Sequence, residues 1–409
     1  MKYEKLSKLY YKLDSSYKDE VEKRKCGYGS YLTSLKILGF KKGNVTDDLF
    51  ELFYVNTHDL MMLHSEVLLN SAKVSSLISQ LPPFVVDSYF KKLIVNEAQS
   101  SNEIEGVRST KKELKEALSE LEKASPKNKR FVGLMKTYSY IDRIKPFDNV
   151  EDFRKLYDEL VSDEIESDDT LDGELFRKGY VEINNGNVTT HIGLSSEEKI
   201  VEALGSLVHY LSDISHPELY RYMVAHYYYE YIHPFYDGNG RTGRLIVGSY
   251  LSRYLEKYSA ITFSYAVNKD KSKYYKSLEE IAFPLNRGDM TFYLISVLEL
   301  LSDGQAGVIE DLELSLIKLE RIEAYFKKDI WKDHNNESIM LNLMVSLSVF
   351  FKEGATLSLQ DLMEISNKSR HIVNKAMDYL VDEGYVEVIR KKPKTYRLCD
   401  ECLETILGS

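Results

Sequence analysis

The sequence predicts a mostly α-helical protein with one small β-hairpin, followed by a C-terminal winged helix-turn-helix domain. Apolar residues recur about every 3.6 positions along most of the 409 residues, which is the period of an amphipathic helix. One short stretch, residues 181–192, instead alternates apolar and polar residues around an Asn-Gly pair, which is typical of a hairpin. From residue 338 onward, the expected order of helices and strands is that of a winged helix-turn-helix.

The composition is ordinary for a soluble globular protein, with 43% hydrophobic and 29% charged residues, and it excludes a wholly disordered chain. The N-terminus lacks the apolar segment of a secretory signal. The longest nearly apolar stretch, residues 343–351, is shorter than the roughly 20 residues that cross a bilayer. Three cysteines are too few for a disulfide scaffold. We therefore expect a cytoplasmic protein that does not contact a membrane.

Residues 1–84 are expected to form an N-terminal helical region. Several apolar residues in this region keep a helical spacing: Leu49, Leu52, Phe53, Leu60, Leu63 and Val67. Pro82 and Pro83 break the pattern, because proline lacks the N–H group that a helix interior needs. A domain boundary is therefore expected after residue 84.

Residues 85–330 are expected to form the main helical domain. Its first helix is predicted over about residues 85–106. Thr110 and Glu113 have the spacing of a capping box, in which each satisfies a free N–H group at the start of the next helix. Further helices are expected over residues 217–232, over residues 241–254 and up to about residue 330.

The hairpin over residues 181–192 stands alone among these helices. Its turn is predicted at residues 184–187, because Asn and Gly tolerate the positive φ of a tight turn. The alternating positions on either side are Val181, Ile183, Val188, Thr190 and Ile192. A two-stranded hairpin is marginally stable alone, so we expect it to lie on another part of the protein. A surface loop without a function is the alternative.

Residues 338–409 are expected to form the winged helix-turn-helix domain, with a helix over residues 369–383 and a hairpin over residues 386–398. Residues 366–398 hold eight Lys or Arg and four Asp or Glu, a net charge of +4 in a chain of net charge −10. The basic residues of interest are Lys368, Arg370, His371, Lys375, Arg390, Lys391, Lys392 and Lys394. They could contact the DNA backbone, or the domain could instead bind another protein.

The segment His233–Arg244, with the sequence HPFYDGNGRTGR, is the densest cluster of polar residues and lies between two expected helices. Gly238, Asn239 and Gly240 allow successive backbone N–H groups to face one anion, and the following helix adds its own free N–H groups. No Walker A sequence occurs in the chain, so a phosphate bound here would not use a P-loop.

Four side chains of this segment suit phosphate chemistry. Arg241 and Arg244 are one helical turn apart, so both guanidinium groups can reach the same di- or triphosphate. Asp237 offers a hard oxygen ligand for Mg²⁺, and His233 can accept a proton near neutral pH. Each residue alone would also fit a glycine-rich turn with surface arginines and a core histidine, but their combination within one short segment favours a phosphate site.

The segment resembles the signature of the Fic family, HPFx(D/E)GN(G/K)RxxR, with every fixed position matched. The resemblance covers roughly residues 85–300 and implies a Fic-type helical core with a hairpin flap over residues 181–192. It implies a protein adenylyltransferase, which moves AMP from ATP to a Ser, Thr or Tyr hydroxyl of a protein. Many bacterial members of the family carry a C-terminal winged helix similar to the one expected here.

The resemblance implies a role for each matched residue. His233 would be the general base for the target hydroxyl, Phe235 would anchor the loop, and Asp237 would hold Mg²⁺. The implied phosphate ligands are Gly238, Asn239, Gly240, Arg241, Thr242 and Gly243, with Arg244 on the γ-phosphate. The flap residues implied to cover ATP are Val188, Thr189, Thr190 and His191. The residues implied to contact adenine or ribose are Tyr274, Tyr275 and Asn286.

A second match lies in the sequence SSNEIEG, residues 100–106, which is similar to the inhibitory motif (S/T)xxxE(G/N) of the same family. The matching residues are Ser101, Glu105 and Gly106. The resemblance implies that the helix over residues 85–106 is inhibitory, because Glu105 would pair with Arg244 and occupy the charge meant for the γ-phosphate.

From the sequence we therefore expect an auto-inhibited protein adenylyltransferase that uses ATP and Mg²⁺. Its target would be a protein, which could be a second copy of the chain, and a homodimer is possible. A de-AMPylase that uses the same site is one alternative, with Glu105 activating water. A nucleotide-responsive DNA-binding regulator without turnover is another.

Overall fold

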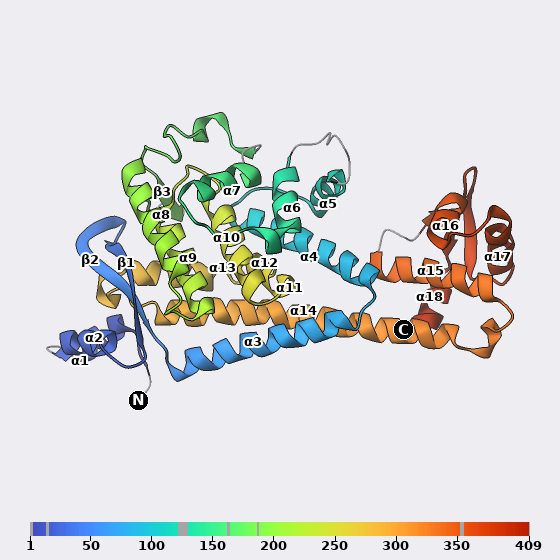
Figure 1. Cartoon of the computed structure of the whole chain (residues 1–409), viewed down its shortest axis with the longest axis horizontal. Coiled ribbons are helices and arrows are strands. Elements are labelled where there is room, and N and C mark those ends of the chain that lie inside the picture. The colour runs from blue at the N-terminus through green and yellow to red at the C-terminus, as the bar shows by residue number, and fades with distance from the viewer. Residues whose placement is uncertain are drawn as a thin grey trace. The chain divides into compact units, whose positions relative to one another are not determined.

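The computed structural model describes residues 3–13, 16–121, 130–161, 164–185, 188–351 and 356–408. These residues are mostly helical and include three small sheets, in agreement with the predicted fold class (Figure 1). The chain divides into two compact units. The central unit comprises Met1–Ser75 and Lys91–Val308, and the C-terminal unit comprises Ser76–Phe90 and Ile309–Ser409. The predicted boundaries at residues 84 and 330 differ from this division, because the first 75 residues group with the main helical domain.

The N-terminal part of the central unit holds helices α1 (Leu6–Leu13) and α2 (Tyr17–Lys25) and a long antiparallel hairpin of strands β1 (Ser30–Lys41) and β2 (Asn44–Val55). The prediction that residues 1–84 are helical is therefore wrong for the hairpin. The turn is made by Lys42 and Gly43, which both have positive φ, as a two-residue hairpin turn requires.

The residues of β1 show the period of two that the prediction overlooked. Thr33, Leu35 and Ile37 are buried, and the residues between them are exposed. The apolar spacing of residues 49–53 resembles that of a helix because Leu52 and Phe53 are successive residues of β2 buried on opposite faces of the hairpin, whereas Leu49 is exposed.

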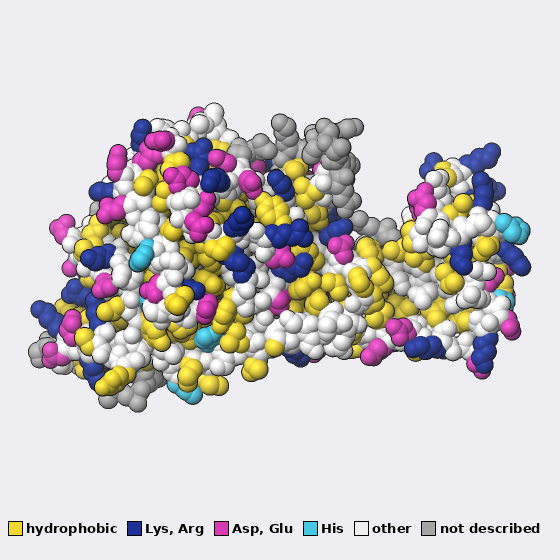
Figure 2. Space-filling view, in the orientation of Figure 1, with side chains coloured by type: hydrophobic (Ala, Val, Ile, Leu, Met, Phe, Trp, Pro, Cys, Tyr) yellow, Lys and Arg dark blue, Asp and Glu magenta, His cyan; other side chains and the backbone are white. Residues whose placement is uncertain are grey.

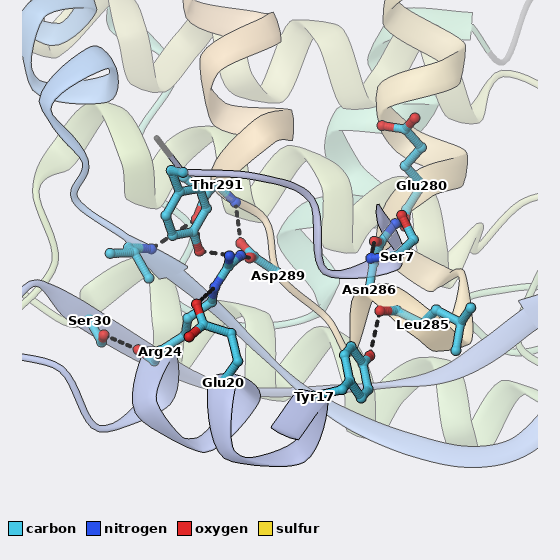
Figure 3. Close-up of polar contacts among 12 residues, drawn as sticks. Ser7, Tyr17, Glu20, Arg24, Ser30, Glu280, Leu285, Asn286, Asp289 and Thr291 are labelled. Atoms are coloured by element: carbon cyan, nitrogen blue, oxygen red, sulfur yellow. Dashed lines mark hydrogen bonds and ion pairs between the residues drawn. The ribbon is translucent and has the colours of Figure 1, made fainter. Parts of the chain in front are cut away.

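Helices α1 and α2 are held against the segment between α13 (Lys271–Ala282) and α14 (Thr291–Phe326), as Figure 3 shows. The guanidinium group of Arg24 pairs with Asp289 at 3.1 Å, and both side chains are buried. Tyr17 donates a hydrogen bond to the carbonyl of Leu285 at 2.6 Å. These contacts fix the N-terminal segment to the helical core.

The helices that follow the hairpin are α3 (His58–Ser79), α4 (Pro83–Ile104), α5 (Lys111–Glu120), α6 (Val132–Ser139), α7 (Glu151–Val161), α8 (Glu197–Ser212), α9 (Glu218–Ile232), α10 (Asn239–Tyr254), α11 (Lys257–Ala260), α12 (Phe263–Lys269), α13 and α14. Short 3₁₀ helices lie at Ile141–Arg143, Ser167–Asp169, Pro284–Asn286 and Asp329–Trp331. The capping box of Thr110 and Glu113 is confirmed at the start of α5. Helices α9 and α10 pack against each other in the middle of the central unit, and nearly all their residues are buried (Figure 1).

The predicted hairpin is confirmed as strands β3 (Glu182–Asn185) and β4 (Val188–Ile192), with Ile183 opposite His191. Its turn residues Gly186 and Asn187 lie outside the described residues. The flap is not isolated, because β4 contacts β2 of the N-terminal hairpin.

The C-terminal unit contains α15 (Asn335–Phe351), β5 (Thr356–Ser358), α16 (Leu359–Ser366), α17 (Arg370–Asp382), β6 (Val386–Lys391), β7 (Lys394–Leu398) and α18 (Asp400–Leu407). The strands form one sheet in the order β5-β7-β6. Through β7 the order of elements is the predicted one. A capping box of Ser358 and Asp361 begins α16. Helix α18 was not predicted.

Among the described residues, α14 is a helix long and apolar enough to cross a membrane by length and composition alone. However, 56% of its most apolar 18-residue window is buried inside the structure. Core packing therefore accounts for the apolar character of α14.

Candidate functional site

The loop between α9 and α10 is shaped by two left-handed residues, His233 with φ 53° and Gly238 with φ 80°. Phe235 anchors the loop in the core, where its buried ring stacks on Tyr157 with centroids 3.6 Å apart. The Asn239 side chain accepts a hydrogen bond from the N–H of Phe235 at 2.9 Å and donates one to its carbonyl at 2.7 Å. The Asn239 side chain therefore holds the loop, and only its backbone N–H could serve a phosphate.

Arg241 lies beside the loop but not in the cavity described below. Its guanidinium group pairs with Glu164 at 3.0 Å and with Asp237 at 2.9 Å, and its side chain is only 1% exposed. The Arg241 guanidinium group is thus engaged by two carboxylates, and its role at the phosphates stays a prediction. The Thr242 hydroxyl is also turned inward, because it donates to the carbonyl of Gly238 at 2.8 Å.

Arg244, one turn further along α10, faces the end of α4 and Glu105. Its Nη1 pairs with Glu105 Oε1 at 2.9 Å, its Nε donates to the Ser101 hydroxyl at 3.1 Å, and its Nη2 donates to the Ser101 carbonyl at 3.0 Å. Burial lowers the pKa of Arg244, but the surrounding acidic groups, with Glu105 the strongest of them, together raise it by more, so the net pKa lies above its usual value. The expected pairing of Glu105 with Arg244 is present.

The carboxylate of Glu105 lies directly over the first turn of α10. A Cβ atom added at Gly240 would overlap this carboxylate and crowd the Arg244 guanidinium group. Glycine at position 240 thus lets an acidic group approach the positive end of the helix. The same approach would be available to a phosphate.

A cavity of about 340 Å³ opens beside Glu105 and Arg244, a size suited to a small ligand. Helices α9, α10 and α13, the flap and the N-terminal hairpin all contribute to it. Its lining residues are Phe40, Glu105, Glu182, Ile183, Asn184, Thr190, His191, Tyr227, Glu230, Tyr231, His233, Gly240, Arg244, Tyr274, Tyr275, Leu278, Glu279 and Ala282. Aromatic, aliphatic and charged side chains all contribute to this lining.

Two histidines in the cavity are neutral at pH 7. Burial, together with the nearby His191 and Arg177, lowers the pKa of His233 to about 3. Burial also lowers the pKa of His191 to about 4, and its Nε2–H donates to the carbonyl of Tyr231 at 2.8 Å. A neutral His233 can accept a proton. A bound triphosphate would raise its pKa, because nearby negative charge favours the imidazolium form.

Glu230 is a cavity residue that the sequence reasoning missed. Burial raises its pKa, Arg244 opposes the shift and Glu105 adds to it. The net pKa is about 8, so this carboxyl is mostly neutral at pH 7. A Cβ atom at Gly243 would overlap the Glu230 side chain, so this glycine allows α9 and α10 to pack closely here. Gly243 does not line the cavity. Glu230 lies three residues before His233, a spacing that could have indicated its position.

The other expected ligands divide into those that reach the cavity and those that do not. Tyr274 and Tyr275 line it from the first turn of α13, and Thr190 and His191 line it from the flap. The flap residues Val188 and Thr189 do not line it, and the Val188 side chain is 61% exposed.

Asn286 is not part of the cavity, which corrects the expectation that it contacts adenine or ribose. Its Oδ1 accepts a hydrogen bond from the N–H of Ser7 at 2.9 Å, and its Nδ2 donates to the carbonyl of Glu280 at 2.7 Å (Figure 3). The side chain of Asn286 therefore connects α1 to the end of α13.

Asp237 is the residue available for Mg²⁺. One of its oxygens accepts from Arg241, and its side chain is 42% exposed, so the second oxygen can take a ligand. No cluster of three or more His, Cys, Asp or Glu side chains suited to a metal occurs in the described ranges. A single carboxylate is compatible with Mg²⁺, because this ion is often held mainly by phosphates and water.

Arg177 is a second residue that the sequence did not indicate. It is fully buried, and it donates to the carbonyl of His233 at 2.8 Å and to that of Gly179 at 2.6 Å. Burial lowers its pKa to about 10, so it stays charged at neutral pH. Arg177 thereby holds the backbone of His233 in its left-handed conformation.

We expect Arg177→Met to lower the free energy of unfolding by about 2–4 kcal/mol, since buried carbonyls would lose their donors at a cost of about 1–3 kcal/mol each. Urea unfolding followed by circular dichroism measures the change. The matched control is Lys178→Met at the exposed neighbouring position. Equal stability of the two variants would show that Arg177 does not support the loop.

Comparison with known proteins agrees with the resemblance found in the sequence. Residues 146–251 match the model of the Fic/DOC family, and this range includes the flap, α9, the loop and nearly all of α10. A search of curated proteins gives no significant match.

Solved structures include similar chains. A Fic family protein from Desulfovibrio desulfuricans G20 has 18% identity and a TM-score of 0.54, over 85% of this chain and 98% of that chain. A Fic domain containing signaling protein from Bacteroides thetaiotaomicron VPI-5482 has 20% identity and a TM-score of 0.44, over 62% of this chain and 98% of that chain. Fic-1 from C. elegans has 17% identity and a TM-score of 0.41, over 61% of this chain and 73% of that chain. The similarity to the Desulfovibrio desulfuricans protein shows a shared fold.

Proposed function

We propose that the chain is a protein adenylyltransferase that is held inactive by its own residue Glu105. The observation that carries this proposal is the ion pair of Glu105 with Arg244, at the start of α10 and beside a neutral His233 in one cavity. The match of residues 146–251 to the Fic/DOC family supports the same reaction class. Transfer of label from ATP to protein by a Glu105 variant tests it, as set out in the Discussion.

In this proposal the cavity positions ATP and a target hydroxyl. His233 accepts the hydroxyl proton, and the oxygen attacks the α-phosphate while pyrophosphate leaves. The backbone N–H groups at the start of α10 and the Arg244 guanidinium group stabilise the negative charge of the phosphates. Asp237 would hold Mg²⁺, which neutralises part of the phosphate charge when bound.

Inhibition follows from competition for Arg244. With Nε and Nη2 already bonded to Ser101, Nη1 is the group that Glu105 occupies. A γ-phosphate meets both an occupied Nη1 and the negative charge of Glu105. ATP can then bind only with its phosphates displaced, and the α-phosphate is out of line with the attacking hydroxyl.

Removal of AMP from a modified protein is a second candidate, because the Glu105 carboxylate lines the cavity and is 23% exposed. It could activate a water molecule for attack on an AMP-modified hydroxyl. The two candidates differ in the effect of Glu105→Gln, which should increase AMP transfer but abolish AMP removal.

The C-terminal unit is further proposed to be a winged helix-turn-helix that contacts DNA. Arg370, His371 and Lys375 are exposed on α17. Arg390, Lys391 and Lys392 are exposed at the β6–β7 turn, and Figure 2 shows Lys and Arg side chains gathered on this unit. Lys394 is less available, because it pairs with Asp378 at 2.8 Å.

The full chain is expected to shift duplex DNA at low salt and to lose this binding steeply as salt rises. The double variant Lys391→Gln/Lys392→Gln should bind several-fold more weakly, because two phosphate contacts are lost. Lys327→Gln, an exposed lysine elsewhere on the unit, is the matched control. Absence of any shift at low salt would leave the alternative in which the unit binds another protein.

A further inference from the structure

The N-terminal hairpin of β1 and β2 reaches the cavity, although nothing in the sequence connects it to the site. Phe40, near the end of β1, is half-buried and lines the cavity. Two contacts fix this position. The N–H of Leu38 donates to the Tyr231 hydroxyl at 3.0 Å, and the Cβ position of Gly43 at the hairpin turn lies 3.9 Å from Thr189 of the flap.

Phe40 lies on the flap side of the cavity. The ring centroid of His191 in the flap is 6.5 Å from that of Phe40 and 6.4 Å from that of His233. Gly240 and Arg244, the proposed phosphate-binding residues, line the same cavity from the start of α10.

Helix α13 relates the position of the β1 end to that of Glu105. At its start, the Tyr275 hydroxyl donates to the carbonyl of Ile104, next to Glu105. Just past its end, Lys41 of β1 lies 5.9 Å from the ring centroid of Phe283. Eight residues of helix separate these two points, which is about 12 Å.

The aliphatic lining of the cavity comes from Ile183 of the flap and from Leu278 and Ala282 of α13, and their chain neighbours Glu182, Asn184 and Glu279 line the cavity as well. An aromatic ring among aliphatic side chains suits the flat face of a nucleobase, since every base offers a π-face for stacking. The carboxylates of Glu182 and Glu279 would repel phosphates, which carry the same sign of charge.

We propose that Phe40 binds the nucleoside part of the bound nucleotide, so that the N-terminal hairpin completes the nucleotide cavity. The proposal rests on the proposed function only in taking a nucleoside triphosphate as the ligand. With the triphosphate at Arg244 and Gly240, the base extends along α13 and packs against the ring of Phe40. Phe40 is thus a positioning residue for the base.

The test measures binding by calorimetry in the Glu105→Gln background, with ATP and inorganic triphosphate as the two probes. Phe40→Leu keeps an apolar side chain in the hairpin but removes the aromatic face, and Phe40→Trp keeps a ring. Leu49→Ala is the matched control, because Leu49 lies on β2 and its side chain is 61% exposed outside the cavity.

Phe40→Leu is expected to weaken ATP binding about tenfold, which is the scale of one base–aromatic contact. It should leave triphosphate binding unchanged, and Phe40→Trp and Leu49→Ala should bind ATP as their parent does. Unchanged ATP binding in Phe40→Leu, or an equal loss for triphosphate, would overturn the proposal. Failure of the Glu105→Gln parent itself to bind ATP would instead contradict the proposed function and, with it, this inference.

Discussion

Replacing Glu105 with Gln is expected to raise AMP transfer by about 10²-fold or more. The variant keeps the shape of the side chain but removes its charge, so Nη1 of Arg244 becomes free for a γ-phosphate. The bonds of Arg244 to Ser101 do not depend on Glu105, so α4 should stay in place. The higher rate reflects alignment of the α-phosphate with the attacking oxygen, because a small misplacement of these atoms lowers the rate by about 10²-fold.

The measurement is incorporation of label from ATP labelled at its α-phosphate, by the chain alone and with a cell lysate. Glu103→Gln is the matched control, because Glu103 is an exposed acidic residue on the same helix that contacts Asn268 and not Arg244. Glu105→Gly should also be active, although it changes the backbone beside Gly106. Equal incorporation by Glu105→Gln and the wild type, with ATP bound in both, would exclude inhibition by this residue.

Replacing His233 with Ala in the Glu105→Gln background is expected to lower AMP transfer by about 10²–10⁴-fold, the usual effect of losing a general base. ATP binding should change little. His233 lies before the loop of Gly238 and is neutral, so it acts on the target hydroxyl and not on the phosphates.

Two readouts separate a role of His233 in the reaction from a role in ATP binding. Label transfer measures the reaction, and calorimetry measures ATP binding. His209→Ala, at an exposed position on α8, is the matched control and should keep full activity. If His233→Ala loses ATP binding together with transfer, His233 is a binding residue and its assignment as the base is wrong.

The parts of the site that are local in sequence could be predicted. The segment from His233 to Arg244 forms a loop and a helix start, whose glycines and arginines have fixed spacing, so the position of Arg244 near the start of α10 follows from the residues themselves. The anchoring role of Phe235 came from the family resemblance. The pairing with Glu105 came from a family resemblance, since 139 residues separate the two in the sequence.

The parts that depend on distant contacts could not be predicted. Arg241 was expected at the phosphates, and its ion pair with Glu164, 77 residues earlier, could not be predicted from the sequence. Asn286 was expected in the cavity, but its side chain instead accepts a hydrogen bond from the N–H of Ser7. Phe40 was missed because its strand was taken for a helix, and only the folded hairpin brings it beside His191.

The most direct test of the account compares ATP labelled at the α-phosphate with ATP labelled at the γ-phosphate, each incubated with the Glu105→Gln variant and Mg²⁺. Adenylyl transfer retains the α-phosphate on the protein and releases the γ-phosphate in pyrophosphate. The account predicts protein label from the α-labelled ATP alone, and loss of this label when His233→Ala is added. Label from γ-labelled ATP, or no protein label from either while ATP is bound, would contradict it.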